Sequence, residues 1–193
     1  MNIKAENLGK KFRKHWVFRN LNFDVQEGAL TAVTGNNGSG KSTLLQILSG
    51  YLTPSEGDIY LNKSKIGIED HHLIGFAAPY IELPEEFSFE EFMTFHSTFR
   101  ETHFSIGEMA ERSSLPLMKP MTDFSTGMKQ RAQLCTIFYF KNELLFMDEP
   151  TANLDAEGFE WWAKETELLK TTTVIASNQE REIDICQENI SLS

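Results

Sequence analysis

Residues 35–43 read Gly35-Asn36-Asn37-Gly38-Ser39-Gly40-Lys41-Ser42-Thr43 and fit the pattern G-x-x-x-x-G-K-[ST]. An apolar run at 29–34 precedes it and has the composition of a buried strand. The segment 42–50 after it has helical composition, with a glycine placed to end the helix. A strand, a glycine-rich loop and a helix in this order predict a phosphate-binding loop, and a surface turn that matches by chance is the poorer explanation.

The residue types in this loop suit a nucleotide with a bound cation. The three glycines allow a tight turn whose N–H groups point inward, and the helix beginning near Lys41 presents its positive dipole end. Lys41 is predicted to reach the β- and γ-phosphates, and the Ser42 hydroxyl to ligate Mg²⁺. The sequence therefore predicts that ATP with Mg²⁺ binds to nine consecutive residues: Gly35, Asn36, Asn37, Gly38, Ser39, Gly40, Lys41, Ser42 and Thr43.

A second motif places two carboxylates after an apolar strand, in the stretch Leu144-Leu145-Phe146-Met147-Asp148-Glu149-Pro150. Asp148 is predicted to hold Mg²⁺, and Glu149 to polarise the attacking water as general base. Apolar runs that end in Asp-Glu are also common where a strand meets solvent. The assignment depends on the phosphate-binding loop upstream.

The rest of the chain predicts an α/β fold with a P-loop NTPase core and a mainly parallel sheet. Stretches 3–8 and 17–25 have the alternation of a small N-terminal antiparallel sheet, and 144–147 and 172–176 are strand-like runs separated by a helix at 159–169. Between 83 and 123 the pattern is helical, with Phe89, Phe92, Phe95 and Phe99 three or four residues apart. We expect one domain over 1–193, with a helical subdomain at about 84–135 inserted in the α/β core.

Composition excludes several classes of protein. The 193 residues suffice for one globular domain, and no apolar stretch approaches the length of a membrane-spanning helix or a secretory signal. Two cysteines without C-x-x-C spacing predict neither a disulfide framework nor a zinc site. The formal charge of -10 argues against a nucleic-acid partner. These features predict a cytoplasmic location.

A third motif identifies the subclass by resemblance. The stretch Phe124-Ser125-Thr126-Gly127-Met128-Lys129-Gln130-Arg131 resembles the L-S-G-G-Q signature of ABC ATPases, and it stands shortly before the Asp148 strand as in that family. The resemblance implies that Ser125 and Gly127 touch the γ-phosphate bound by the other cassette of a dimer. Taken alone, Ser125-Thr126-Gly127 would more often be just a helix cap, and the order of the motifs is what favours the signature.

The resemblance extends over residues 3 to about 180 and implies further site residues. Phe12 stands where the family carries an aromatic that stacks on adenine, although Trp16 competes for that role and a core position is the alternative. Asp155 stands in a loop that resembles the one after the catalytic Glu. Together these positions imply a site completed between two cassettes.

Two positions depart from the family pattern. Pro79 replaces a Gln that touches Mg²⁺ and relays the nucleotide state to the permease, and Tyr80 or Glu82 are nearby polar substitutes. Asn178 replaces a His that contacts the γ-phosphate, and an amide carries neither a proton nor a positive charge for catalysis. We therefore predict that Lys41, Glu149 and Asn178 act in a slow ATPase.

The function implied by the resemblance is that of an ABC transporter subunit that binds and hydrolyses ATP. It would form a head-to-tail homodimer or heterodimer and power a separate transmembrane permease, by which it is held at the inner face of the cell membrane. The alternative is an ATP-dependent binding or regulatory cassette with little hydrolysis. A DNA-repair or translation ATPase is disfavoured, because 193 residues leave no room for the additional modules of those relatives.

The phenylalanines between 89 and 99 have two interpretations. They are either the core of the helical subdomain or, in part, an exposed groove for a segment of the permease. The cargo and the direction of transport are not encoded in any of these motifs.

Overall fold

The computed structural model describes residues 1–66, 68–102 and 104–192, and the chain folds into two compact units. We name them unit 1 and unit 2. Unit 1 comprises Met1–Phe76, Glu143–Glu149 and Lys170–Ser193, and unit 2 comprises Ala77–Asn142 and Pro150–Leu169. The chain therefore leaves unit 1 directly after two segments that carry site residues, at Phe76 and at Glu149.

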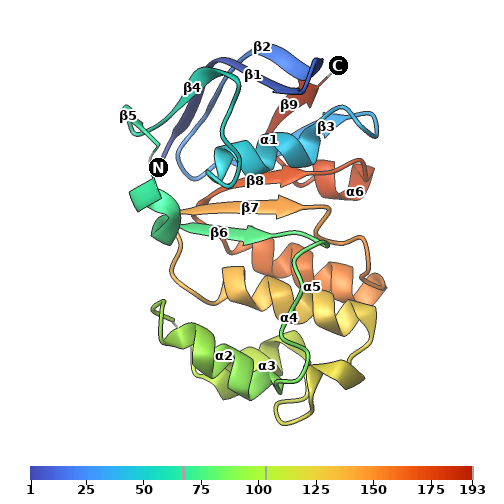
Figure 1. Cartoon of the computed structure of the whole chain (residues 1–193). Helices are drawn as coiled ribbons and strands as arrows, with labels where there is room; N and C mark the ends of the chain where they lie inside the picture. The colour runs from blue at the N-terminus through green and yellow to red at the C-terminus, as the bar shows by residue number, and fades with distance from the viewer. Residues whose placement is uncertain (67, 103, 193) are drawn as a thin grey trace. The chain divides into compact units, whose positions relative to one another are not determined.

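Unit 1 contains an antiparallel sheet in the order β2-β1-β4-β5 (Figure 1). β1 and β2 pair along their length, from Ile3 opposite Val25 to Phe12 opposite His15, so they are longer than the strands predicted at 3–8 and 17–25. β4 and β5 were not predicted, because only alternate residues at the end of β4 are buried and β5 has two residues. The strands of this sheet are β1 (Ile3–Phe12), β2 (His15–Val25), β4 (Glu56–Leu61) and β5 (Ser64–Lys65).

The second sheet of unit 1 has the order β6-β7-β8-β3-β9, and β7, β8, β3 and β9 run parallel to one another. The fully buried β7 and β8 agree with the apolar runs of the sequence, because a central parallel strand has both faces covered. β9 was missed, because just one of its residues is buried. These strands are β3 (Leu30–Gly35), β6 (Ile74–Ala77), β7 (Leu144–Asp148), β8 (Thr172–Ala176) and β9 (Glu188–Leu192).

The helix α1 (Lys41–Leu48) starts immediately after the glycine-rich stretch, and its apolar face is buried. It ends before Ser49, and Gly50 follows with a φ of 78°, a left-handed conformation that suits glycine as a helix terminator. One hydrophobic cluster joins α1 to side chains of both sheets, among them Ile3, Ile59 and Val174. Unit 1 is completed by the short helices η1 (Ile68–Leu73) and α6 (Glu180–Ile183).

Unit 2 is helical. Ser88 and Ser105 begin α2 and α3 as reciprocal capping boxes with Glu91 and Glu108, each of which satisfies free N–H groups at the helix start. The predicted helical range 84–135 lies within unit 2, which also holds a helix from the later part of the chain. Its elements are α2 (Phe89–Ser97), α3 (Ile106–Ser113), η2 (Met121–Asp123), α4 (Thr126–Phe138) and α5 (Ala156–Glu167).

The phenylalanine series of unit 2 divides between core and surface. Phe89 and Phe92 are buried, whereas Phe95 and Phe99 are 55% and 71% exposed and contact each other with their ring centroids 5.1 Å apart. The core interpretation is therefore confirmed for Phe89 and Phe92, and the contact of the exposed half with a permease stays a prediction. Within the described parts of the chain, no helix combines the length and apolar character needed to cross a membrane.

Candidate nucleotide site

The parallel sheet brings the two main motifs to one edge of unit 1. Val33 of β3 lies opposite Ala176 of β8, and Ala176 lies opposite Asp148 of β7. The loops that follow these parallel strands emerge at the carboxyl edge of the sheet, where ligands of open α/β sheets bind. The glycine-rich stretch, Glu149 and Asn178 therefore gather at the same edge.

The backbone of the phosphate-binding loop depends on glycine at two positions with different surroundings. Gly40 has a φ of 100°, and a Cβ added there would lie 2.4 Å from Cγ1 of Val17. Gly38 has a φ of 83°, but no described atom lies within 4 Å of an added Cβ. Gly40 is thus required by packing against β2, whereas Gly38 borders open space at the mouth of the loop.

These glycines give a first testable prediction. Gly40→Ala should lower the free energy of unfolding by about 2–4 kcal/mol, because it combines a left-handed backbone with a steric clash. Gly38→Ala carries the backbone strain alone and should cost about 1 kcal/mol. Chemical denaturation of both variants measures the difference, and equal losses would contradict the packing role of Gly40.

Hydrogen-bond donors within the loop are suited to an anion. Lys41 is buried to 6% exposure, and its Nζ donates to the carbonyl oxygens of Gly35 at 2.8 Å and Asn36 at 3.3 Å. The hydroxyl of Ser39 is buried and has no partner among residues 1–66, 68–102 and 104–192. A buried cation bonded to neutral carbonyls and a buried hydroxyl without a partner fit a phosphate group.

The carboxylates after β7 differ in exposure. Asp148 is 3% exposed, whereas Glu149 is exposed and has a φ of 46°, which is uncommon for a residue other than glycine. The N–H of Glu149 donates to the carbonyl of Ala176 at 2.9 Å, which holds this backbone in place. Such strained conformations concentrate at functional sites.

The fit of Mg²⁺ rests on Ser42 and Asp148. Ser42 is exposed in the first turn of α1, and Asp148 ends β7. In the described chain, no group of three or more His, Cys, Asp or Glu side chains is arranged to hold a metal ion. Mg²⁺ needs no such cage, because it is commonly held by one or two protein oxygens together with phosphates and water.

Asn178 is placed against the phosphate-binding loop. Its Nδ2 donates to Oδ1 of Asn37 at 2.6 Å, and both side chains line a hollow of about 610 Å³ together with Gly35 and Ser191. The amide that replaces the expected His is thus within reach of the loop. In this structure one of its two N–H donors is engaged by Asn37.

The two aromatic candidates for adenine stacking lie at the same end of the β1–β2 hairpin. Phe12 is 49% exposed, and the Lys10 ammonium lies 5.1 Å from its ring centroid. Trp16 is 36% exposed, with the Arg19 guanidinium 4.5 Å away. The core interpretation of Phe12 is wrong, because the ring is half exposed. Both rings are available for stacking, and they are close in sequence to Val17, which packs on Gly40.

The signature residues lie in unit 2. Ser125 is the N-cap of α4 and accepts a hydrogen bond from the Met128 N–H at 3.2 Å. A Cβ on Gly127 would lie 2.9 Å from the carbonyl oxygen of Asn153, so the first turn of α4 contacts the loop before α5. Only glycine permits this approach without movement of the backbone.

Asp155 has a structural role in unit 2. It caps α5 by accepting from the Gly158 N–H at 2.8 Å, and it pairs with the Arg131 guanidinium at 3.4 Å. The hydrogen bond from Gly158 and the nearby positive charge lower the pKa of the Asp155 carboxyl. Asp155 therefore stays ionised and fixes the start of α5.

Two buried glutamines were missed by sequence reasoning. Gln130 and Gln133 of α4 are 5% and 4% exposed. Their only signal in the sequence is the spacing of three residues within a helical segment, which places two polar side chains on one face. Nothing in that spacing reveals that the face is buried.

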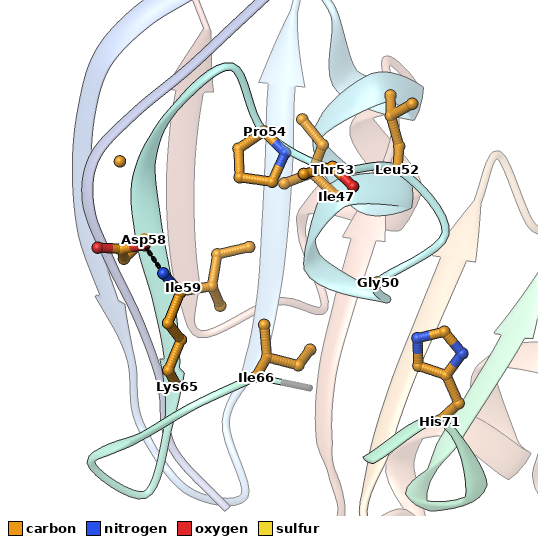
Figure 2. Close-up of a pocket in the computed structure, with 11 residues that line it drawn as sticks. Ile47, Gly50, Leu52, Thr53, Pro54, Asp58, Ile59, Lys65, Ile66 and His71 are labelled. Atoms are coloured by element: carbon orange, nitrogen blue, oxygen red, sulfur yellow. Dashed lines mark ion pairs between the residues drawn. The ribbon is translucent and has the colours of Figure 1, made fainter. Parts of the chain in front are cut away.

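A separate pocket of about 360 Å³ in unit 1 does not belong to this site (Figure 2). It is lined by Ile47 and Gly50 at the end of α1, whereas the phosphate-binding loop lies at the beginning of that helix. An ion pair between Asp58 and Lys65 forms part of its wall. The pocket is therefore remote from the phosphate end of α1.

Comparisons with known proteins agree with this geometry. The ABC transporter family model matches residues 18–152. An uncharacterised ABC transporter ATP-binding protein of Bacillus subtilis, YxlF, is 35% identical over 184 residues, which cover 91% of this chain and 61% of the relative. The energy-coupling factor transporter ATP-binding protein EcfA2 of Thermotoga maritima is 32% identical, over 88% of this chain and 67% of the relative. This chain thus spans about three fifths of the Bacillus relative.

Solved structures support the fold. A putative ABC transporter ATP-binding protein of Pyrococcus furiosus superposes with a TM-score of 0.88 at 24% identity, covering 100% of this chain and 98% of that one. An ATP-binding cassette solved as a dimer with ADP and Pi gives 0.86 at 21% identity, covering 99% and 94%. At this identity the likeness shows the fold alone, and it confirms the predicted P-loop NTPase core. With the family match over most of its length, the chain belongs to the ABC transporter family of ATP-binding proteins.

Proposed function

We propose that this chain is the ATP-binding and ATP-hydrolysing subunit of an ABC transporter and powers transport through a separate membrane permease. The observation that carries the proposal is the carboxyl edge of the parallel sheet. There the phosphate-binding loop follows β3, and the buried Asp148 and the exposed Glu149 stand at the end of β7, with only β8 between these two strands of the sheet. A phosphate cradle beside a carboxylate base is the arrangement that water-dependent cleavage of ATP requires.

Each group has one role in the proposed reaction. Lys41 binds the β- and γ-phosphates in place of the carbonyl oxygens that it now contacts. Ser42 and Asp148 hold Mg²⁺, which when bound neutralises phosphate charge. Glu149 accepts the proton of the attacking water. Phe12 or Trp16 supplies an aromatic face for adenine.

The active form is proposed to be a head-to-tail homodimer or heterodimer of cassettes. Ser125 at the N-terminus of α4 and Gly127 would meet the γ-phosphate held by the other cassette, because a helix N-terminus attracts anions. Asp155 would act there indirectly, by fixing the loop that precedes α5. A dimeric relative of the same fold has been solved with ADP and Pi.

The permease is the proposed membrane partner, and it would hold the chain at the inner face of the cell membrane. Unit 2 exposes Phe95 and Phe99 side by side, and Tyr80 and Phe87 are also 50% and 40% exposed. Exposed aromatic side chains of this kind commonly mark a surface for another protein. We therefore place the permease contact on unit 2.

A second candidate function is an ATP-dependent binding cassette with little hydrolysis. The observation in its favour is the hydrogen bond between Asn178 and Asn37, which engages one of the two N–H donors of the amide that stands in place of the expected His. Pro79 adds to it, because its side chain offers no polar group to the nucleotide. Turnover separates the two candidates.

The test is Mg²⁺-dependent ATP turnover by the purified chain, compared with Asn178→His and Asn178→Ala. Histidine should raise turnover by up to about 10²-fold, since it restores a cationic donor for the transition state. Alanine should not raise turnover, because its side chain supplies no hydrogen-bond donor. Tight ATP binding with no turnover by any of the three proteins would favour the binding cassette.

A further inference from the structure

Helix α4 carries two buried amides that bind the two segments entering unit 2 from the sheet strands. The Nε2 of Gln130 donates to the carbonyl oxygen of Pro150 at 3.1 Å, and Pro150 directly follows Glu149. The Nε2 of Gln133 donates to the carbonyl oxygens of Ala78 at 2.9 Å and Ile81 at 3.0 Å. We call Gln130 and Gln133 the glutamine clamp.

The segment held by Gln133 is a tight turn. The Ile81 N–H donates to the Ala78 carbonyl at 3.0 Å, and Pro79 stands at the second position of this four-residue turn, where its fixed φ is favourable. Ala78 is completely buried. The turn is therefore closed by its own hydrogen bond and fastened to α4 by one side chain.

The orientation of the Gln133 amide follows from its partners. If the amide were reversed, its oxygen would face two carbonyl oxygens and both hydrogen bonds would be lost. In the observed orientation Oε1 is buried, and no described residue donates to it. Gln133 lines a hollow of about 190 Å³ together with Pro79, Thr126 and Asn153. The free energy gained from the two donated hydrogen bonds thus exceeds the cost of leaving the buried Oε1 without a donor.

We propose that Gln133, supported by Gln130, is a positioning residue that fixes the turn 78–81 to the signature helix α4. Because Pro79 has no polar side chain, the connection between this turn and the signature helix is made through backbone carbonyls and the Gln133 amide. The clamp holds Ala78 and Ile81, which come shortly after Phe76, and Pro150, which directly follows Glu149. The position of these residues therefore follows that of α4. This inference rests on the proposed ATPase function and names a residue that supports it.

Three substitutions at Gln133 separate the contributions of its atoms. Gln133→Met keeps the volume and removes all hydrogen bonds, and Gln133→Glu keeps the shape but removes the donor. Gln133→Lys keeps a donor for the two carbonyls and removes the acceptor, and two acidic residues line the same hollow: Glu82, and Glu85, which pairs with Lys129. Gln26→Met, at an exposed turn of unit 1, is the matched control.

We expect Gln133→Met and Gln133→Glu to lower kcat for ATP about tenfold and to speed hydrogen exchange at the Ile81 amide about tenfold, as loss of two ordinary hydrogen bonds predicts. The dissociation constant for ATP should change by less than about twofold, because the phosphate-binding loop belongs to unit 1. Gln133→Lys should restore most of both values. Gln26→Met should match the wild type.

Two results would overturn the inference. One is wild-type kcat and Ile81 exchange in Gln133→Met, and the other is equal impairment of the Met and Lys variants, which would leave side-chain packing as the whole effect. If the wild-type chain shows no turnover, the proposed ATPase function fails. The exchange rates at Ile81 then still decide whether the Gln133 amide holds the turn.

Discussion

Replacing Glu149 with Gln is expected to lower Mg²⁺-dependent ATP turnover by about 10²-fold or more, because a positioned general base contributes about that factor. The amide has nearly the same shape as the carboxylate but cannot accept the proton of the attacking water. Glu149 is exposed at the carboxyl edge of the sheet, with its backbone held by Ala176. The substitution therefore removes the proton acceptor and leaves the fold unchanged.

The matched control is Glu143→Gln. Glu143 precedes β7, is also exposed and lies at the opposite end of that strand from Glu149. It should keep wild-type turnover, and both variants should bind ATP within about twofold of the wild type, since neither touches the phosphate-binding loop. Unchanged turnover in Glu149→Gln would refute the role of Glu149 as the base and favour the binding cassette.

The second large effect is expected at Lys41. Lys41→Met retains most of the aliphatic stem but removes the charge, so ATP should bind about 10- to 10²-fold more weakly, the range for charged hydrogen bonds to a phosphate. The buried ammonium now has neutral carbonyl partners at Gly35 and Asn36. A phosphate is a better partner for it, which is the physical reason for the expected loss.

Calorimetric titration with ATP measures this effect. Lys164→Met, an exposed lysine of α5, is the control and should bind ATP as the wild type does. Thermal unfolding should be measured for both variants without nucleotide, so that loss of folded protein is not mistaken for loss of affinity. Wild-type affinity in Lys41→Met would remove this residue from the phosphate site.

Motif spacing predicted the main elements of the site because both motifs are local. A loop that must turn its N–H groups inward needs glycine within a few residues of Lys41, and a buried parallel strand needs an unbroken apolar run before Asp148. Strand ends were less predictable. β1 continues to Phe12 over three residues that are not buried, and the edge strand β9 buries one side chain, so both stretches have a weak hydrophobic pattern.

The exposure of aromatic residues was beyond sequence reasoning. Phe92 and Phe95 are the same residue type three positions apart in one helix. Phe92 is nevertheless 9% exposed and Phe95 is 55% exposed. Helical periodicity predicts that these residues share a face, but the width of the buried stripe depends on what packs against it. Phe12 is likewise half exposed although it ends a strand whose earlier residues Ile3, Ala5 and Leu8 are buried.

The family and the positions of the glycine-rich loop, Asp148 and Glu149 at strand ends could be read from the sequence, because each depends on a short pattern of neighbouring residues. The hydrogen-bond partners of the side-chain amides became visible only in the folded chain. Asn178 bonds to Asn37, 141 positions away, and Gln133 bonds to a turn more than fifty positions before it. Hydrogen bonds between residues far apart in the sequence depend on how distant segments pack. A single sequence carries no local signal of that packing.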